Sequence, residues 1–589
     1  MDIDTEWLGD WHAPGGEPAG SGAPDLTILH LSDLHGQLAP GQQVYYRTER
    51  GGPPIDFEDG RSTLTQIGGL ATHVAKIDQL RSAGETLVLM SGDTFHGSAE
   101  TTFSNGRIMV EPINEHVRPD VYVPGNWDFG NEAVADGSAQ SLFDALDAPV
   151  LANNLQDEAG EQLYEGYTLV ERAGHTIGVV GMTNPYVDRM APAFHDGKYT
   201  FGKSPTLLDR TARAAREAGA EFVIAVTEIG LPWMVQAGKD FDSVDLSLSA
   251  HTHEYTYEPI GLPETGTTVI ESGMGGSLGR VDLRFDDAGP ALRHVLYTFA
   301  IDAPYTPSPD EATRETVRQL REPFLEADPD RHRGVVDLHQ PIDTVVGETG
   351  TELARQSFLE SPVNTLLNDA LREATGADLA VSHGNRYGLA LPAGEITLED
   401  LYTLVPVTAP VAVGDAWGQQ LRSHVEAYLI DNFTPHVYDQ EDGRVRAFSS
   451  NVALEIDPTA KRGRRLVSMT VDGEPIDPEA TYRVASFKRP GTGRRRIGGC
   501  NFPFRNVQEL DRAPIDVLVE YLEANSPVDY QAEGRVRAAP SGGPVQNTPG
   551  DGNYPFIQPG VDYAGGSAYV ETSMIPNRFE HPEIPRADR

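Results

Sequence analysis

The chain has 589 residues, with 88 Asp and Glu against 46 Lys and Arg, so its formal net charge is −42. This length suits two to four domains, and a hydrophobic content of 39% is enough to build their cores. The charge argues against binding to bare nucleic-acid backbone or to an anionic membrane surface, because both need a basic face. Only six of the basic residues are lysines. An acidic, lysine-poor composition predicts a high-salt environment, typical of a halophile.

The N-terminal sequence and the cysteine content bear on the compartment. Residues 1–7 lack the basic and apolar regions of a signal peptide, and no run approaches the ~18 apolar residues of a membrane-spanning helix. Cys500 is the only cysteine, so no disulfide can form within the chain. We therefore expect a cytoplasmic protein, with export by an unrecognised route as the alternative.

The first part of the chain predicts an α/β domain. Residues 1–24 are rich in Gly, Pro and Ala and predict a flexible leader. From 25 to 300, short apolar runs alternate with helical patterns, as in layered α/β domains. The runs that predict buried strands are Leu26–Leu31, Leu87–Met90, Val121–Val123, Ile177–Val180, Phe222–Val226 and Val269–Ile270. The residues that recur at helical spacing between the first two runs are Leu70, Val74, Ile77 and Leu80.

A linker and a second domain follow. Residues 301–334 predict a linker that contains a charged helix near 310–321, which we expect to end before Pro323 because proline disrupts helices. Residues 335–540 predict an α+β domain. Residues 541–589 are dense in Pro and Gly and predict an extended tail.

Five polar motifs each follow an apolar strand of the first domain. In chain order they are Ser32–Gly36 (SDLHG), Ser91–Gly97 (SGDTFHG), Pro124–Gly130 (PGNWDFG), Val226–Gly230 (VTEIG) and Ser249–Glu254 (SAHTHE). Loops at the carboxyl ends of such strands converge, and carboxylates, amides and imidazoles together suit divalent ions. One such motif alone is more often a solvated loop. Five in order predict a two-metal site that activates water and stabilises an oxyanion.

These motifs resemble those of the calcineurin-like metallophosphoesterases, and specifically the 5′-nucleotidase family with its separate C-terminal domain. The family pattern is Asp-x-His, Gly-Asp-x-x-x-Gly, Gly-Asn-His-Glu, Thr-His-x-Gly and Gly-His-x-His. The resemblance implies a four-layer α/β/β/α sandwich followed by a smaller α+β substrate domain. It also implies two divalent ions, with Mn²⁺ favoured and Zn²⁺ second. The implied ligands of one ion are Asp33, His35, Asp93 and His253, and those of the other are Asp93, Asn126, Glu228 and His251.

Two residues depart from the family pattern. Glu228 stands where the family has a metal-binding histidine, although a carboxylate also binds Mn²⁺. Trp127 stands where the family has the histidine that assists the leaving group, and tryptophan cannot supply a proton. The catalytic candidates that remain are Asn126 and Asp128. His96 lies in the second motif at a position that is not a ligand position, and we interpret it as a loop residue.

The Trp127 departure resembles a sister group, the SoxB-type thiosulfohydrolases, whose pattern is Gly-x-Trp-[Glu/Asp]-Phe. Ser382–Gly388 (SHGNRYG) resembles the Ser-Pro-Gly-Phe-Arg-Trp-Gly of that branch, and Leu391–Asp400 also matches it. Asn126, by contrast, follows the nucleotidase pattern. In either branch, Arg386 and its neighbour Asn385 are expected to face an anionic substrate.

Aromatic and basic residues near the C-terminal end of the second domain leave two interpretations open. Phe502 and Phe504 follow Gly498-Gly499, where nucleotidases carry an aromatic residue that stacks on the base, but the motif is broken here. Base stacking and ordinary core packing are both consistent with these residues. The run Arg494–Arg496 predicts either contact with an anionic substrate or a solvated loop.

These observations predict a metal-dependent hydrolase with two candidate substrates. One is a nucleotide phosphoester, and the other is a thiosulfonate on a carrier-protein cysteine. A thiol has a pKa of ~8.5, so a thiolate leaves more readily than an alkoxide and needs less help from the missing histidine. The rival hypothesis is a catalytically degenerate metal- or nucleotide-binding protein, which Trp127 and Glu228 keep open. Neither nucleic acid nor a membrane is expected as a partner.

Overall fold

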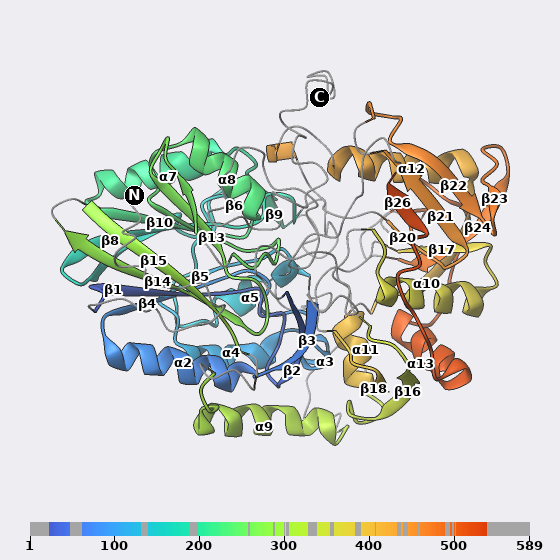
Figure 1. Cartoon of the computed structure of the whole chain (residues 1–589), viewed down its shortest axis with the longest axis horizontal. Coiled ribbons are helices and arrows are strands. Elements are labelled where there is room, and N and C mark those ends of the chain that lie inside the picture. The colour runs from blue at the N-terminus through green and yellow to red at the C-terminus, as the bar shows by residue number, and fades with distance from the viewer. Residues whose placement is uncertain are drawn as a thin grey trace. The chain divides into compact units, whose positions relative to one another are not determined.

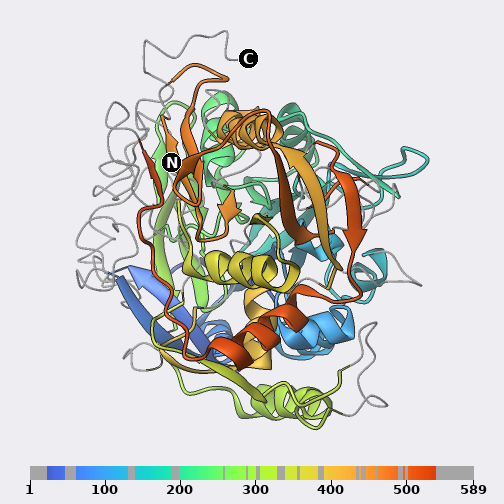
Figure 2. The ribbon, with the colours of Figure 1, turned by 90° about the vertical axis from the view of Figure 1, so that its right-hand side faces the viewer.

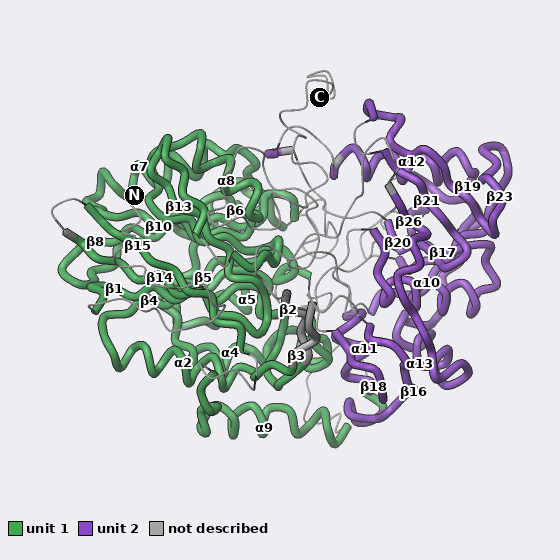
Figure 3. The backbone as a smooth tube through the Cα atoms, viewed as in Figure 1, with its two compact units in different colours: residues 1–43, 65–339, 561–567 green, residues 44–64, 340–560, 568–589 purple. Residues whose placement is uncertain are grey.

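The structure is a computed structural model that describes most of the chain. The described residues are 23–46, 62–130, 139–187, 198–256, 259–286, 289–299, 301, 306–327, 338–353, 359–382, 390–406, 408–432, 437–439, 446–457, 460–488, 495–497, 500 and 502–538. The tail expected over 541–589 and nearly all of the leader expected over 1–24 lie outside them. Two compact units divide the chain (Figure 3). The first comprises residues 1–43, 65–339 and 561–567, and the second comprises 44–64, 340–560 and 568–589.

The first sheet of the N-terminal unit has the strand order β15-β14-β1-β4-β5. Its members are β1 (Leu26–Ser32), β4 (Thr86–Ser91), β5 (Val121–Val123), β14 (Ser277–Asp286) and β15 (Gly289–Thr298). The strands β1, β4 and β5 run parallel, which explains why their sequences are continuous apolar runs. Ser32 lies opposite Ser91, and Ser91 lies opposite Val123. The three following loops therefore leave the sheet at one edge.

The second sheet has the order β12-β13-β11-β10-β8-β7. Its members are β7 (Tyr167–Arg172), β8 (His175–Met182), β10 (Phe222–Thr227), β11 (Leu246–Ser249), β12 (Ile260–Leu262) and β13 (Thr267–Glu271). The four central strands are parallel and the two edge strands are antiparallel. Thr227 lies opposite Ser249, and Ser249 lies opposite Glu271, so the loops after β10 and β11 also start at one edge.

Apolar side chains from both sheets meet in one core, and helices cover the outer faces. The core includes Ile28 and Leu89 from the first sheet and Val179 and Ile224 from the second. Helices α7 (Thr206–Glu217) and α8 (Leu231–Asp240) pack on the second sheet, and α2 (Leu70–Ala83) lies beside the first (Figure 1). The predicted four-layer sandwich is confirmed. All four residues that predict the first helix are buried on α2.

The charged helix of the linker is longer than expected. It is α9 (Glu311–Leu325), and Asp310 caps it by accepting a hydrogen bond from the backbone of Thr313. The expectation that it ends before Pro323 is wrong, because the helix continues through that residue. Phe324 is buried, with its ring 6.5 Å from that of Phe103. This tertiary contact accounts for the tolerance of a proline in the last turn.

Short elements complete the N-terminal half of the chain. They are β2 (Gly41–Tyr46), β3 (Ser62–Ile67), α3 (Ala99–Ser104), α4 (Val110–Pro112), α5 (Gln140–Phe143), β6 (Leu155–Asp157) and β9 (Tyr199–Phe201). Helix α3 begins directly after the second polar motif. Its cap residue Ser98 accepts a hydrogen bond from the backbone of Thr101, which fixes the start of the helix.

The C-terminal unit has the predicted α+β composition. Its larger sheet contains, in spatial order, β20 (Ala447–Phe448), β17 (Leu379–Ser382), β24 (Thr481–Phe487), β19 (Val411–Trp417) and β25 (Arg505–Glu509). A second sheet contains β23 (Glu474–Pro475), β22 (Leu466–Val471), β21 (Val452–Ile456) and β26 (Val536–Ala538). An antiparallel pair joins β16 (Val345–Thr349) to β18 (Gly394–Thr397).

Four α-helices accompany these sheets in the described part of the unit. They are α10 (Pro362–Thr375), α11 (Leu398–Leu404), α12 (Gly418–Asn432) and α13 (Pro514–Asn525). Figure 2 shows α10 in yellow beside α13 in red-orange, and the two helices contact each other. One apolar core joins both sheets to α12 through residues such as Val484, Leu454 and Leu421.

Candidate metal centre

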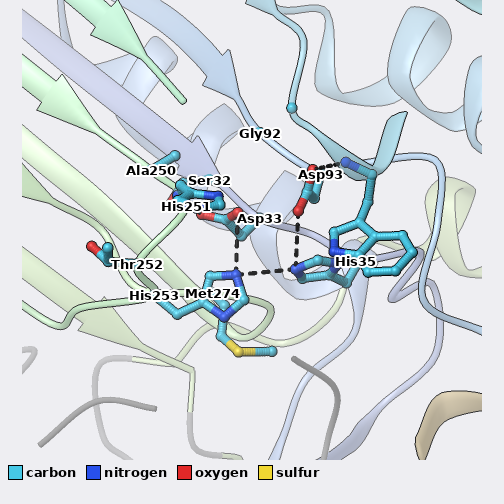
Figure 4. A network of polar contacts seen from close by, with 12 residues as sticks. Ser32, Asp33, His35, Gly92, Asp93, Ala250, His251, Thr252, His253 and Met274 are labelled. Atoms are coloured by element: carbon cyan, nitrogen blue, oxygen red, sulfur yellow. Dashed lines mark hydrogen bonds and ion pairs between the residues drawn. The ribbon is translucent and has the colours of Figure 1, made fainter. Parts of the chain in front are cut away.

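Four of the predicted metal ligands form one buried group. Asp33, His35, Asp93 and His253 each offer a ligand atom, and these atoms all lie within 4.8 Å of one another. His253 Nε2 is 3.3 Å from Asp33 Oδ1, and His35 Nε2 is 3.8 Å from Asp93 Oδ2 (Figure 4). The two imidazole Nε2 atoms are 3.1 Å apart. Imidazole nitrogens that converge with carboxylate oxygens form the donor set of a divalent ion.

The remaining predicted ligands adjoin this group. Glu228 Oε1 lies 3.4 Å from His251 Nδ1, and the backbone N–H of His251 donates to Asp33 Oδ2 over 3.1 Å. Asn126 is buried at the start of a short 3₁₀ turn. Each of these residues comes from a loop at the shared sheet edges, as the spacing of the motifs predicts.

Two glycines make room for the carboxylates. A Cβ at Gly92 would lie 2.2 Å from Glu228 Oε2, and a Cβ at Gly125 would lie 2.2 Å from Asp93 Oδ1. Gly92 also has a φ of +83°, which favours glycine. The glycines before Asp93 and Asn126 are therefore required by close approach, and the first of them by turn geometry as well.

Backbone strain is concentrated at the ligands. Asp33, His35, His251 and His253 have φ values of 49°, 46°, 85° and 58°. Non-glycine residues rarely adopt positive φ, and such residues gather at functional sites where the surrounding structure holds them. Four residues of the proposed site share this feature.

The buried carboxylates of this group would be stabilised by a bound cation. Asp93 Oδ2, Asn126 Oδ1 and both carboxylate oxygens of Glu228 are buried and accept no hydrogen bond from the described residues. Burial, and then the charges of Asp33 and Asp93, raise the pKa of Glu228 well above its usual value. Burial, and then Asp128 and Asp33, raise the pKa of Asp93 in the same way. Buried carboxylates this close together need a compensating positive charge, so the residues present fit divalent metal ions.

Asp128 has a different environment from these residues. Its Oδ1 accepts hydrogen bonds from the backbone N–H groups of Thr94 (2.7 Å) and Phe95 (3.0 Å). Its Oδ2 accepts from the Gly125 N–H (2.7 Å) and the Tyr122 hydroxyl (2.5 Å). The first two bonds tie the second motif to the third, and the other two hold Asp128 within the third motif and against β5. The geometry thus indicates that Asp128 positions two loops, and its catalytic role stays a prediction.

Glu271 performs a similar task for the fifth motif, although no sequence motif includes it. This buried residue ends β13 and accepts hydrogen bonds from Ser249 Oγ (2.8 Å), Thr252 Oγ1 (2.6 Å) and the Glu254 N–H (2.9 Å). Those three donors flank or separate the two histidines of the motif. The signal that could have revealed Glu271 is a single acidic residue directly after the apolar pair Val269–Ile270.

Trp127 and His96 form a stacked pair beside the site. Their ring centroids are 4.6 Å apart with an interplanar angle of 17°. The backbone N–H of Trp127 donates to Asp93 Oδ1 over 2.6 Å, and the His96 carbonyl lies 3.3 Å from His35 Nδ1. Both residues therefore contact proposed ligands, a relation that motif spacing does not reveal.

The predicted substrate residues belong to the C-terminal unit. Arg386 and Asn385 lie outside the described residues. Phe504 is fully buried in the core of that unit, whereas Phe502 is partly exposed, with its ring centroid 4.7 Å from that of Phe504. Phe504 thus has the environment of a core residue, and Phe502 keeps an accessible edge.

Two family matches cover most of the chain. The calcineurin-like phosphoesterase family matches residues 26–255, and the 5′-nucleotidase C-terminal domain family matches residues 342–493. The chain belongs to the 5′-nucleotidase family of calcineurin-like metallophosphoesterases. Members of this family are metal-dependent hydrolases, and this chain is one of them. The predicted resemblance is confirmed.

Relatives align along the whole length of both domains. Protein UshA of Yersinia enterocolitica is 24% identical over 87% of this chain and 94% of its own length. An apyrase of Tabanus yao is 23% identical over 87% of this chain and 93% of its own. The solved structure of the sulfate thiohydrolase SoxB of Thermus thermophilus has a TM-score of 0.75 at 23% identity, covering 88% of this chain and 97% of that one. A 5′-nucleotidase precursor of the same organism has a TM-score of 0.71 at 19% identity, covering 87% and 99%.

The structural neighbours establish the fold and leave the substrate open.

No helix among the described residues has the length and apolar character needed to cross a bilayer.

Proposed function

We propose that the chain hydrolyses the phosphoester of a nucleotide with the help of two divalent metal ions. The observation that carries this proposal is the buried ligand group, in which carboxylate and amide oxygens lack hydrogen bonds from the described residues. The presence of the 5′-nucleotidase C-terminal domain supports a nucleotide as the substrate. Relatives named apyrase and 5′-nucleotidase-related protein support it further.

The proposed roles follow from the geometry. Asp33, His35, Asp93 and His253 would hold one ion, and Asp93, Asn126, Glu228 and His251 would hold the other. Bound divalent ions supply an activated water and stabilise charge on the oxygens of the substrate. The second ligand set has three oxygen donors for one nitrogen, which favours Mn²⁺ over Zn²⁺.

The chain's own residues would orient the reaction. The side chains of Glu228 and Asp93 would stay in place when the ions bind, because the backbone at Gly92 and Gly125 lies close against them and leaves them little room to move. We assign to the Asn126 side-chain N–H a hydrogen bond to an oxygen of the substrate, while its Oδ1, which accepts no hydrogen bond from the described residues, would complete the second ligand set. From the C-terminal unit, Arg386 and Asn385 would bind the anionic group, and Phe502 would stack on the base.

A second candidate substrate is a cysteine-linked thiosulfonate on a carrier protein. The observation that favours it is the replacement of the leaving-group histidine by Trp127, together with the hydrogen bonds that occupy Asp128. A thiolate needs no proton to leave, whereas an alkoxide does. The SoxB structural neighbour shows only that the fold accommodates either chemistry.

A substrate panel distinguishes these proposals. The full-length chain would be assayed with Mn²⁺ in molar salt on 5′-AMP, on 2′,3′-cyclic AMP and on a cysteine S-thiosulfonate peptide. The nucleotide proposal expects turnover of 5′-AMP that Asp93→Asn abolishes, and turnover of the peptide alone would replace it with the thiosulfonate proposal. Two bound metals with no turnover of any substrate would instead indicate a binding protein.

We further propose that the acidic composition adapts the enzyme to high salt. A chain with a net charge of −42 repels an anionic substrate at long range, and salt screens this repulsion. Activity should therefore rise from low to molar salt. A steady fall in activity, with circular dichroism showing an intact fold, would contradict this interpretation.

A further inference from the structure

A cavity of about 470 Å³ lies beside the edge strand β25 of the C-terminal unit. Six described residues line it: Arg495, Phe504, Arg505, Asn506, Val507 and Glu509. This volume falls within the range of small-molecule sites in proteins. None of these residues belongs to the metal-ligand motifs.

Arg495, an exposed residue, lines this cavity and is anchored through one nitrogen of its guanidinium. Its Nε donates to the Phe504 carbonyl over 3.2 Å, and its own carbonyl accepts from the Phe504 N–H over 2.7 Å. Phe504 is in turn fully buried. The side chain is thus tied to the core through its inner nitrogen, while its terminal nitrogens make no hydrogen bond or ion pair with the described residues. Such pre-organisation lowers the entropic cost of binding an anion.

Arg505 is held in a comparable way. Its guanidinium carbon lies 4.4 Å from the ring centroid of Trp417, and one terminal nitrogen donates to Thr481 Oγ1 over 2.9 Å. Trp417 is 46% exposed, an unusual state for so large an apolar side chain. Stacking on an indole orients a guanidinium without neutralising it.

The carboxylates near these arginines already have other partners. Asp415, opposite Arg505 in the strand pair, accepts hydrogen bonds from Asn506 Nδ2 (2.7 Å) and Arg483 Nη1 (2.9 Å). These two bonds, Asn506 first, and then the charges of Arg483 and Arg505, hold the pKa of Asp415 below its usual value. Glu509 pairs with Lys488. Arg495 and Arg505 form no ion pair in the described part of the chain, so positive charge is in local excess within a strongly acidic protein.

We propose that this cavity of the C-terminal unit binds the phosphate group of a small anion. The lining contains two arginines, each with one guanidinium nitrogen anchored by a hydrogen bond, and guanidinium groups bind phosphate oxygens well. The positive φ of Asn506 (48°) turns the strand backbone at the wall of the cavity. The source of the phosphate is either inorganic phosphate or a nucleoside monophosphate. The proposal does not rest on the proposed function, because none of the proposed metal ligands lines the cavity.

The test is equilibrium binding of inorganic phosphate, 5′-AMP and adenosine to the full-length chain in the presence of a chelator, which prevents turnover of AMP at the proposed metal centre, at the lowest salt that keeps the chain folded. The variants are Arg495→Ala and Arg505→Ala, with Arg512→Ala as a control of the same charge change, because Arg512 pairs with Glu520 elsewhere on the unit. We expect one phosphate site per chain to weaken about 10- to 100-fold in the first two variants, the range of a lost charge-assisted hydrogen bond. Arg512→Ala should retain it.

Each outcome decides the proposal. AMP binding at least ten-fold tighter than phosphate identifies a nucleotide as the source, and equal affinities identify free phosphate. Unchanged phosphate binding in both cavity variants, with circular dichroism showing folded protein, overturns the proposal. An equal loss in Arg512→Ala overturns it as well, since net charge alone would then explain binding. Adenosine bound as tightly as AMP, with the same loss in the variants, would show that the cavity does not recognise phosphate. Because the readout is binding, a failed nucleotidase assay leaves this test intact.

Discussion

The candidate metal centre contains two kinds of buried carboxylate, and the difference between them distinguishes the proposed ligands from the residues that support the loops. Asp93 and Glu228 each carry at least one oxygen without a hydrogen bond from the described residues, and we call them the bare carboxylates. Asp128 and Glu271 accept four and three hydrogen bonds, and we call them the bonded carboxylates. All four are at most 1% exposed. Burial is therefore common to both kinds, and what distinguishes the proposed ligands among these four residues is unfilled acceptor capacity.

The first prediction concerns a bare carboxylate and has the largest expected effect. Asp93→Asn should lower kcat/KM by at least ~10³-fold, because Asp93 is proposed to bridge both ions. In the presence of a chelator, the variant should unfold at the same temperature as the parent chain or higher, since a buried like charge has been removed. Activity assays and thermal melts measure the two effects. If Asp93→Asn keeps its activity, Asp93 is not a ligand of the catalytic ions.

The second prediction concerns a bonded carboxylate. Asp128→Asn should destabilise the N-terminal unit by about 3–5 kcal/mol, because an amide group cannot accept all four hydrogen bonds and directs its own N–H groups at other donors. Denaturant unfolding followed by circular dichroism measures this change. The control is Asp93→Asn under the same chelated conditions, which should show no such loss. Equal destabilisation in both variants would show that the bare and the bonded carboxylates do not differ in their contribution to stability.

The third prediction tests whether Glu271 supports the histidine loop. Glu271→Ala should weaken metal binding about 10- to 100-fold, the usual cost of removing a residue that orients metal ligands. Glu271→Gln should recover most of this affinity, because its amide oxygen can still accept from Thr252 and Glu254. Metal titration with a competing chelator provides the measurement. If the two variants lose the same affinity, the hydrogen bonds are not what positions the loop.

The fourth prediction, the smallest, concerns pH. Burial, and then the nearby His294, lower the pKa of His30 to about 3, so the folded state keeps this histidine neutral while the unfolded chain protonates it below about 6.5. The unfolded state then binds more protons, and stability falls as pH drops from 6.5 towards 3. At pH 5 the expected loss from this residue is about 2 kcal/mol. His30→Gln should show a shallower decline between pH 7 and pH 5, and an identical decline would contradict the assignment.

The strands and the proposed ligands are predictable from the sequence because both depend on local patterns. The apolar run Val121–Val123 matches the bounds of β5, and the run Leu26–Leu31 stops one residue short of the end of β1. A parallel strand that is buried on both faces is a continuous apolar run, and a ligand loop follows it directly. The sequence pattern alone therefore places Asp33 and His35 at a sheet edge.

The supports are not predictable in this way because their partners are distant in sequence. Asp128 bonds Thr94, which is 34 residues away, and Glu271 bonds Ser249, which is 22 residues away. Tertiary contact also explains the error at Pro323, where packing of Phe324 outweighs a local rule. Local patterns specify which groups face the site, and long-range hydrogen bonds specify how they are held.

The central claim is that the bare carboxylates hold two metal ions. The most direct test is the metal content of the full-length chain, purified in molar salt with Mn²⁺ and measured by mass spectrometry. The account predicts two divalent ions per chain, reduced to one in Glu228→Ala. Fewer than two ions in the parent chain, or two ions retained in Glu228→Ala, would contradict it.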